Sequence, residues 1–417
     1  MNIWYFHHYA TPETMPGLHR PYSFGKYFLS KGHNLSVFSA SYLHYCDEQI
    51  IKEDVEENYI YKEDNGIQTL FIKTIGYKGS GLKRIINMFQ FFFRLFPVAA
   101  HHGQKKKPDI IIASSPHPLT MVAGIKIAKR FDIPCVCEVR DFWPEVIFKN
   151  GRIKETSLVG RILLRGERWI YEKCNGLVFL KPGDYTYLLE RKWDIDNGGK
   201  VDLTKCFYIN NGVDLKTFEQ NKKTYQLSRG KDYEFDFIVT YCGAIRKVNS
   251  VHLLVEAANY LKKGVVVEIY GTGDCLSELE QYIHEKGLTN VKLNGYVDNC
   301  YIPHILSKSS VNILNYSASK YNWSRGNSSN KLFEYLASGK PVISTVKMGY
   351  DILEEYSCGI STDECTSKSI ADAINYIASL SKEEYSLMCV NATRAACDYD
   401  ISNLADEYLS VVNNLCK

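Results

Sequence analysis

Short apolar runs alternate with amphipathic segments along the first half of the chain. Runs such as Ile110-Ile111-Ile112-Ala113 are apolar at every position, a pattern typical of parallel strands that are covered on both faces. We expect strands over residues 3–6, 35–39, 67–74, 110–114, 134–139, 176–180 and 206–209, and helices over 21–30, 82–99, 120–131 and 158–174. The alternation predicts an α/β fold with a right-handed, doubly wound sheet.

The second half of the chain repeats this rhythm after a polar stretch. We expect strands over 236–241, 265–270, 291–293, 311–313 and 341–345, and helices over 251–261, 276–286, 331–337, 368–379 and 402–415. The pattern predicts two Rossmann-like domains, 1–215 and 233–395, with a linker over 216–232. A C-terminal helix within 396–417 is expected to pack back on the N-terminal domain. Two such domains predict a ligand site in a cleft that both face.

Composition excludes several classes of protein. The chain has 417 residues and a formal net charge of only +3, which does not suggest a nucleic-acid binder. Its 13 cysteines are scattered without a Cys-x-x-Cys pair, as expected of reduced thiols in a cytoplasmic protein. The N-terminus has no secretory signal pattern, and the apolar run 85–100 is too short to span a membrane and contains Arg94.

The segment 326–342 carries the strongest candidate chemistry. Ser328 or Ser329 can cap a short helix, whose first backbone N–H groups and positive dipole end then lie beside Lys331. This combination suits a diphosphate. Glu334, one turn further on, is placed to accept hydrogen bonds from ribose hydroxyls. The alternative is a well-capped surface helix with a solvated lysine and glutamate.

This segment and four others, in the same order, resemble the retaining family-four glycosyltransferases, which have the two-domain fold called GT-B. The four are Ile209–Asp214, Tyr241–Ile245 with Leu253–Ala258, Ile269–Gly273 and Val291–Val297. The resemblance implies a nucleotide-sugar donor, and a site that includes Lys331 and Glu334 together with Gly271, Gly273, Gly326, Ser328 and Asn330. It also implies that no metal or other cofactor is required, because helix dipoles and basic residues hold the diphosphate.

The chain departs from the family pattern at two places. The family often has two glutamates seven residues apart, but the first position here is Gly326, so nearby backbone N–H groups are expected to replace that carboxylate. The family's arginine and lysine, five residues apart, correspond to Ala244 and Asn249. Arg246 is the substitute that we expect to bind the diphosphate, with a solvated loop charge as the alternative.

Three loops of the first domain resemble substrate-contacting loops of the family. Gly17 and Arg20 follow the first strand, where Arg20 is expected to pair with a phosphate or Gly17 to allow close backbone approach; the alternative is an ordinary turn. His117 is expected to donate a hydrogen bond to a sugar hydroxyl. The segment Glu138–Glu145 resembles N-acetylfucosaminyl transferases of bacterial surface polysaccharides. Asp141 or Glu145 is expected to orient the acceptor hydroxyl and Trp143 to stack on a sugar; the alternative is an ion pair of Arg140 with Glu138 or Asp141.

A basic, aromatic segment in the first domain suggests attachment to an anionic membrane surface. Its apolar residues recur at helical spacing and basic residues surround them: Ile85, Phe89, Phe92, Phe93 and Phe96, with Lys78, Lys83, Arg84, Arg94 and 105–107. The alternative is a core helix with a basic rim. The two Asp-x-Asp triplets, 194–196 and 398–400, are expected to be solvated, and no metal site is expected.

The sequence therefore predicts a hexosyl- or N-acetylhexosaminyl-transferase. We expect it to move a sugar from a nucleotide diphosphate, UDP by preference, to a lipid-diphosphate-linked acceptor with retention at the anomeric carbon. The expected setting is bacterial O-antigen or capsule synthesis at the inner face of the membrane, with no nucleic acid as partner. A nucleotide-sugar 2-epimerase and a noncatalytic sugar- or lipid-binding subunit remain alternatives.

Overall fold

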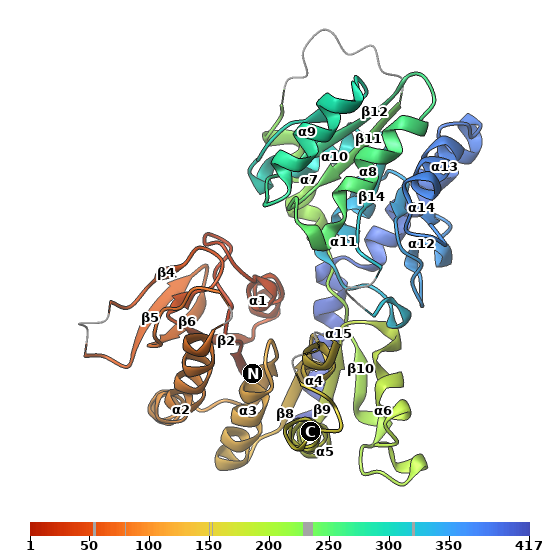
Figure 1. Ribbon diagram of the computed structural model, residues 1–417. Helices are drawn as coiled ribbons and strands as arrows, with labels where there is room; N and C mark the ends of the chain where they lie inside the picture. The colour runs from red at the N-terminus through yellow and green to blue at the C-terminus, as the bar shows by residue number, and fades with distance from the viewer. Residues whose placement is uncertain (53–55, 80, 150, 152, 228–236, 319–321) are drawn as a thin grey trace. The chain divides into compact units, whose positions relative to one another are not determined.

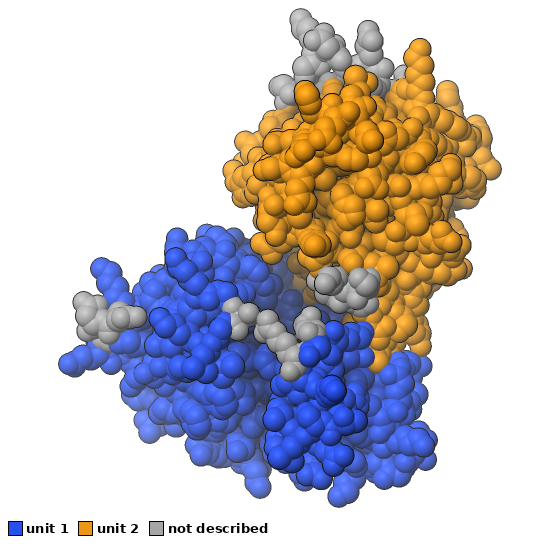
Figure 2. Space-filling model, viewed as in Figure 1, with its two compact units in different colours: residues 1–180, 184–210, 402–417 blue, residues 181–183, 211–401 orange. Residues whose placement is uncertain are grey.

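The computed structural model describes residues 1–52, 56–79, 81–149, 151, 153–227, 237–318 and 322–417. The chain forms two compact units, which Figure 2 draws in different colours. Unit 1 contains residues 1–180, 184–210 and 402–417, and unit 2 contains residues 181–183 and 211–401. Each unit has its own mainly or wholly parallel sheet, so the prediction of two Rossmann-like domains is confirmed.

The sheet of unit 1 has eight strands in the order β10-β9-β8-β7-β1-β2-β6-β5 (Figure 1). Seven of them are parallel: β1 (Asn2–Phe6), β2 (Asn34–Ala40), β6 (Ile67–Ile72), β7 (Ile110–Ser114), β8 (Cys135–Val139), β9 (Gly176–Phe179) and β10 (Cys206–Tyr208). The sequence analysis missed β5 (Tyr59–Asp64), an antiparallel edge strand whose mostly polar residues lack an apolar run. A small hairpin of β3 (Tyr42–Leu43) and β4 (Glu48–Gln49) lies outside this sheet.

Helices cover both faces of this sheet. Helix α3 (Pro118–Phe131) packs against α2 (Leu82–Lys105) and α5 (Leu158–Lys173), and these three share a core with Trp4, Phe6 and Ile111. Helix α1 (Arg20–Ser30) instead packs Phe24 and Phe28 against Tyr408 of α15 (Ile401–Leu415). The C-terminal helix therefore belongs to unit 1. Two short helices, α4 (Trp143–Lys149) and α6 (Thr186–Glu190), follow β8 and β9.

Unit 2 has six parallel strands in the order β13-β12-β11-β14-β15-β16. They are β11 (Phe237–Cys242), β12 (Val265–Tyr270), β13 (Val291–Leu293), β14 (Val311–Leu314), β15 (Val342–Ser344) and β16 (Gly359–Ser361). Helices α8 (Val251–Ala257), α9 (Leu276–Lys286) and α13 (Ser367–Ile377) share one core with these strands. A second core includes α7 (Leu215–Thr224), α10 (Ile302–Ser307), α11 (Asn330–Ala337), α12 (Ile352–Glu355) and α14 (Lys382–Asp398).

The structure differs from the expected boundaries and elements in three ways. The first half of the expected linker is helix α7, which Asp214 caps by accepting a hydrogen bond from the Thr217 backbone N–H at 3.0 Å. The units divide after Asn210 rather than at 215, and residues 228–236 lie outside the described part of the chain. Helix α14 was not predicted, although Ser381 and Glu384 form a capping box at its start.

Candidate functional site

The strand order of unit 2 reverses at β11, whose neighbours β12 and β14 lead the chain away in opposite directions. Open α/β sheets bind ligands at such a switch point, beyond the carboxyl ends of the strands. Gly243 follows β11 and Gly271 follows β12. Helix α11 begins 16 residues after β14 ends, at Asn330, and the contact of its Lys331 with Gly243, described below, brings it to this edge.

The start of α11 presents backbone donors that have no acceptor among the described residues. The Ser329 N–H donates to the side-chain oxygen of Asn327 at 2.9 Å, and the Leu332 N–H donates to the Ser329 carbonyl at 3.2 Å. Within the described residues, no acceptor faces the backbone N–H groups of Ser328, Asn330 or Lys331. A helix start with free N–H groups and a positive dipole end favours an anion.

Lys331 adds a full positive charge to this helix start. Its half-buried Nζ lies 3.2 Å from the Tyr241 hydroxyl and 4.7 Å from the centre of that ring. Burial lowers the pKa of Lys331 to about 8, although Cys242 and Glu334 act in the opposite direction. Gly243 permits this placement, because a Cβ on its backbone, at φ +151°, would overlap the Lys331 ammonium group.

Glu334 lies one turn along the same helix and is also half-buried. Burial raises the pKa of its carboxyl group to about 7, and Lys331 lowers it in part. No hydrogen-bond donor to this carboxylate is present among the described residues. The Glu334 oxygens are therefore able to accept hydrogen bonds from a ligand, as vicinal hydroxyl groups of a ribose would offer.

Close backbone packing joins the loops after β11 and β12. The Gly271 N–H donates to the Gly295 carbonyl at 2.7 Å, and a Cβ on Gly271, at φ +144°, would overlap the Gly243 carbonyl oxygen. A Cβ on Gly273 would overlap the carbonyl oxygen of Ile245. The two glycines thus bring their loop against the Gly243 loop, whose first residue touches Lys331.

Two predicted donor-site residues have other surroundings than expected. The Gly326 N–H donates to the Trp323 carbonyl at 3.2 Å, so this N–H does not replace the missing carboxylate. The Ser328 N–H, which has no acceptor among the described residues, is the candidate that we retain for this role. Arg246 lines a cavity of 310 Å³ beside α8 and α9, together with Glu256 and Glu278; neither Lys331 nor Glu334 lines that cavity.

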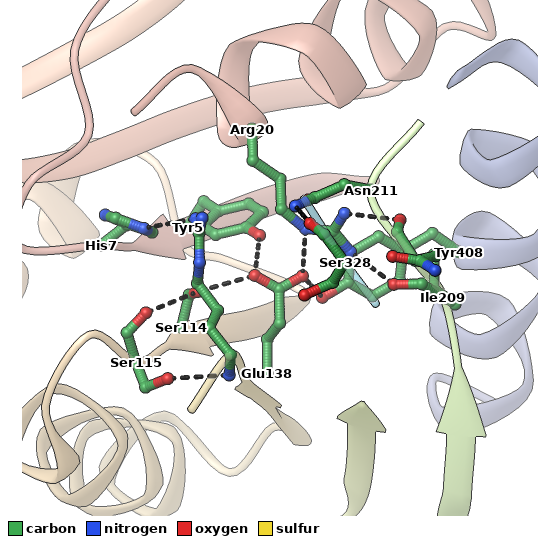
Figure 3. Close-up of polar contacts among 12 residues, drawn as sticks. Tyr5, His7, Arg20, Ser114, Ser115, Glu138, Ile209, Asn211, Ser328 and Tyr408 are labelled. Carbon is green, nitrogen blue, oxygen red and sulfur yellow. Dashed lines mark hydrogen bonds and ion pairs between the residues drawn. The ribbon is translucent and has the colours of Figure 1, made fainter. Parts of the chain in front are cut away.

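Arg20 of unit 1 has different surroundings from those expected, because its guanidinium group is buried and forms an ion pair within the unit (Figure 3). Its Nε donates to Glu138 at 2.8 Å, and its terminal nitrogens donate to the carbonyls of Ile209 and Asn210 at 2.9 and 2.7 Å. The Arg20 side chain is 4% exposed and that of Glu138 is 0% exposed. In the structure Arg20 therefore belongs to a buried ion pair, and its binding of a phosphate stays a prediction.

The same contacts correct the expected pairing of Glu138, which is with Arg20 and not with Arg140. Tyr5 and Ser114 also donate to Glu138, at 2.8 and 2.6 Å. Burial alone would raise the pKa of Glu138. The charges of Arg20 and the nearby Arg140, together with these hydrogen-bond donors, outweigh burial and hold the pKa at about 2. Arg140 instead lies 3.1 Å from Nε2 of His7, and its backbone N–H donates to Ser115.

His117 lies at the switch point of unit 1, where the order reverses between β1 and β7. His117 is almost fully buried, and its Nε2 lies 2.8 Å from Nδ1 of His8. A hydroxyl group could therefore reach only the other ring nitrogen, Nδ1. Sequence reasoning missed His8 and its neighbour Asn87, although the pair His7-His8 directly after the first strand was a visible signal.

The remaining predicted positions are exposed, or bonded within their own loops. Asp141 is exposed after β8, and Gly17 is half-exposed in a loop that the Thr11 N–H closes by donating to Leu18. Asp194 is buried rather than solvated, because it accepts hydrogen bonds from Asn197 and caps a short 3₁₀ helix. The described residues contain no cluster of histidine, cysteine and carboxylate groups that could hold a metal ion.

Two sequence comparisons relate this chain to glycosyltransferases. Residues 236–379 match the family model for glycosyl transferases group 1. The putative teichuronic acid biosynthesis glycosyltransferase TuaH of Bacillus subtilis (strain 168) is 29% identical over 225 residues, which cover 51% of this chain and 55% of that protein. The match thus spans little more than half the length of the relative. Both findings support a glycosyltransferase.

Solved structures share the fold over almost the whole chain. Anabaena HepE in complex with UDP superposes with a TM-score of 0.67 at 16% identity and covers 99% of this chain and 100% of its own. The trehalose-6-phosphate synthase OtsA gives 0.69 at 9% identity, with 99% of each chain covered. The lipopolysaccharide glycosyltransferase WaaG gives 0.63 at 12% identity, covering 98% of this chain and 99% of its own. The GT-B fold is therefore confirmed.

Among the described residues, every helix is either too short or too polar to cross a bilayer.

Proposed function

We propose that this chain is a retaining glycosyltransferase that takes a sugar from a nucleotide diphosphate, with UDP as the preferred carrier. The observation that carries the proposal is the start of α11 at the switch point of unit 2. There the half-buried Lys331 lies beside three backbone N–H groups that have no acceptor among the described residues. The match to glycosyl transferases group 1 covers this same segment. UDP is preferred because HepE, of the same fold, was solved with UDP.

In the proposed reaction, the bond between the anomeric carbon and the diphosphate oxygen breaks, and the acceptor hydroxyl oxygen bonds to that carbon from the same face. The hydroxyl proton passes to the departing diphosphate. Lys331 and the free N–H groups stabilise the negative charge that develops on this leaving group. Glu334 holds the ribose hydroxyls of the nucleotide.

A panel of UDP- and GDP-sugars, incubated with the full chain and bacterial membrane extract, tests the function. Transfer of a labelled sugar to a lipid fraction supports the proposal. A donor that is converted to its 2-epimer without extract identifies an epimerase. Binding of UDP without turnover of any donor identifies a noncatalytic subunit. If the chain neither binds UDP nor turns over any donor, the proposed donor site at the start of α11 is contradicted.

The affinity for UDP is expected to fall as the pH rises above about 8. Lys331 binds the diphosphate as a cation, and its pKa in the free chain is about 8, so deprotonation above that pH removes the charge. The decline approaches about tenfold per pH unit, because one proton must be regained on binding. Titration calorimetry between neutral pH and mildly alkaline pH measures it. A Lys331→Met chain should show no such decline, and an equal decline in both chains contradicts the assignment.

The stability of the ligand-free chain should change in the opposite direction over this range. The unfolded value for a lysine is near 10.5, above the folded value of about 8, so the unfolded state binds more protons between these two values. Unfolding therefore becomes less favourable as the pH rises through this window.

A lipid-diphosphate-linked acceptor at a membrane surface is the second part of the proposal. It is supported by α2, whose outward residues are exposed, with Phe93 at 64%: Leu82, Ile85, Ile86, Phe89 and Phe93. Phe92 and Phe96, which the sequence pattern placed in the same stripe, pack partly against the core. A cavity of 660 Å³ at the start of α2 is lined by three lysines and one carboxylate: Lys52, Lys78, Lys83 and Asp47. The excess of positive charge suits an anionic headgroup or diphosphate.

Helix α5 offers a second apolar and basic surface that the sequence analysis did not identify. Leu158, Val159 and Ile162 are exposed in its first turns, with Leu158 at 75%. Arg161 and Arg165 are exposed beside them. Both α2 and α5 pack against α3, so their exposed starts belong to one layer of unit 1. Apolar side chains flanked by arginine or lysine are typical of helices that lie in a membrane interface.

Replacement of Phe93 and Ile162 by serine is expected to weaken binding to vesicles of phosphatidylcholine and phosphatidylglycerol by about tenfold or more. Each side chain loses roughly 1.5–3 kcal/mol of transfer into an apolar phase. Vesicle sedimentation measures the binding. Tyr376→Ser, at an exposed position of unit 2, is the control that should change nothing. Unchanged binding of the double variant would contradict the proposal that α2 and α5 bind the membrane.

A further inference from the structure

A chain of buried hydrogen bonds connects helix α2 to His117. The Asn87 side-chain nitrogen donates to the Ile75 carbonyl at 2.6 Å, and its oxygen lies 2.7 Å from Nε2 of His8. Nδ1 of His8 in turn lies 2.8 Å from Nε2 of His117. Asn87 and His8 are fully buried and His117 nearly so, and all of these residues belong to unit 1.

The donor and acceptor of each hydrogen bond in this chain follow from the bond between Asn87 and the Ile75 carbonyl. Asn87 uses its nitrogen for the Ile75 carbonyl, so the group that faces His8 is an oxygen, which only accepts. His8 must therefore carry its proton on Nε2. A neutral His8 then has a lone pair on Nδ1, and His117 must donate from its own Nε2. The Nδ1 atom of His117 is left with a lone pair.

Both rings are held neutral, which this reasoning requires. Burial lowers the pKa of His8 to about 3; the bond to Asn87 acts against this shift, and Arg84 and His44 add to it. Burial, and then the neighbours His8, Arg84 and His7, hold the pKa of His117 well below its usual range. Neither ring carries a second proton near neutral pH, so neither bond can reverse by protonation.

We propose that Asn87 and His8 are positioning residues that fix His117 as its Nε2–H tautomer, so that Nδ1 accepts a hydrogen bond from a substrate hydroxyl. The geometry supports this role, because Nδ1 of His117 is buried and has no hydrogen-bond partner among the described residues. A buried acceptor without a donor is unfavourable in the free protein, and a ligand hydroxyl relieves that cost. The identity of the hydroxyl as part of a sugar rests on the proposed function.

The surroundings of His117 suit a sugar. The Tyr9 and Trp143 rings lie edge-on to it, with centroids at 6.3 and 6.5 Å. Aromatic rings pack against the apolar faces of sugar rings, while a single polar atom selects a hydroxyl. The inference also reverses the sequence-based expectation for His117, because the available ring nitrogen accepts a hydrogen bond and does not donate one.

Nitrogen NMR of the full chain tests the proposal without any ligand. Long-range ¹H–¹⁵N spectra of chain labelled in its histidine rings distinguish protonated from unprotonated ring nitrogens. The chain has 11 histidines, so the His117 signals are assigned by their loss in His117→Gln. We expect a neutral ring with its proton on Nε2. A proton on Nδ1 in the unsubstituted chain overturns the proposal.

Two substitutions of His8 form a matched pair. His8→Gln keeps a donor toward Asn87 and an acceptor toward His117, so the His117 tautomer should persist. His8→Leu removes both, so His117 should lose its preference for Nε2–H, and kcat/KM for the donor that the panel identifies should fall by about tenfold. His8→Gln should recover most of that loss. Asn87→Leu provides a second route if His8→Leu does not fold.

The outcomes separate this proposal from the proposed function. A folded His8→Leu chain with an unchanged His117 tautomer overturns the positioning role. The expected tautomers in a chain that turns over no nucleotide sugar leave the positioning role intact and contradict the transferase. Turnover of a nucleotide sugar by a chain whose His117 is protonated on Nδ1 supports the transferase and contradicts the positioning role.

Discussion

Replacement of Lys331 by methionine is expected to lower kcat/KM for the nucleotide sugar by about 100- to 1000-fold, the usual effect of removing one charged donor from a leaving-group site. Methionine keeps an apolar stem of similar length against Tyr241, so packing is preserved while the ammonium is lost. Stability should not fall, because the lowered pKa of Lys331 means that the folded chain disfavours its charge. Steady-state transfer assays and UDP titration measure the effect.

Lys347→Met is the matched control for this substitution. Lys347 lies in the same unit, but it is exposed and pairs with the exposed Asp363 at 2.6 Å. Exposed pairs contribute little, so neither transfer nor UDP affinity should change. Equal losses of activity in the two variants would indicate an effect of overall charge and not of the site. Unchanged activity in Lys331→Met would contradict the assignment of the start of α11 to the donor site.

Replacement of Arg20 by methionine is expected to destabilise unit 1 by about 3–5 kcal/mol, because it leaves Glu138 buried without its main counter-charge. The pair joins α1 to β8, and Tyr408 of α15 also donates to Glu138 at 3.3 Å. The loss concerns folding and not the ligand. UDP affinity of the folded chain should therefore be unchanged. Urea unfolding and UDP titration of the same sample measure the two quantities.

Lys31→Met tests whether burial is the cause of this effect. Lys31 pairs with Asp406 of α15 at 2.9 Å, but both side chains are about half-exposed. This substitution should cost at most about 1 kcal/mol. Should Arg20→Met instead leave stability intact and weaken UDP binding, the sequence-based role of Arg20 as a phosphate ligand would be restored.

The stabilising effect of Glu138 also has a definite pH range. Its folded pKa of about 2 lies below the usual value of 4.5, so the unfolded state binds more protons between these values. The contribution is present above pH 4.5 and is lost as the pH falls toward 2. Acid unfolding of the unsubstituted chain should therefore begin within this window, and Arg20→Met should lack this contribution of Glu138.

The contrast between Lys331 and Arg20 indicates how far sequence reasoning reached. Both were predicted to bind phosphate, since each is a basic residue near the start of a helix that follows a strand and a loop. Lys331 lies beside free N–H groups in the structure, and its role stays a prediction. Arg20 is enclosed by Glu138, Ile209 and Asn210, which lie more than 100 residues away in sequence. No local pattern carries that information.

Local chemistry determined the elements of this protein. Continuous apolar runs gave the parallel strands, and serine, glycine and proline positions gave the limits of α11, because these depend on backbone preferences and burial within a few residues. Only tertiary structure decided which charges are free. It brought Tyr408 to Glu138, turned Asn87 toward His8 and left Nδ1 of His117 without a partner among the described residues. Hydrogen bonding and desolvation depend on neighbours in space, and the fold supplies those neighbours from distant parts of the chain.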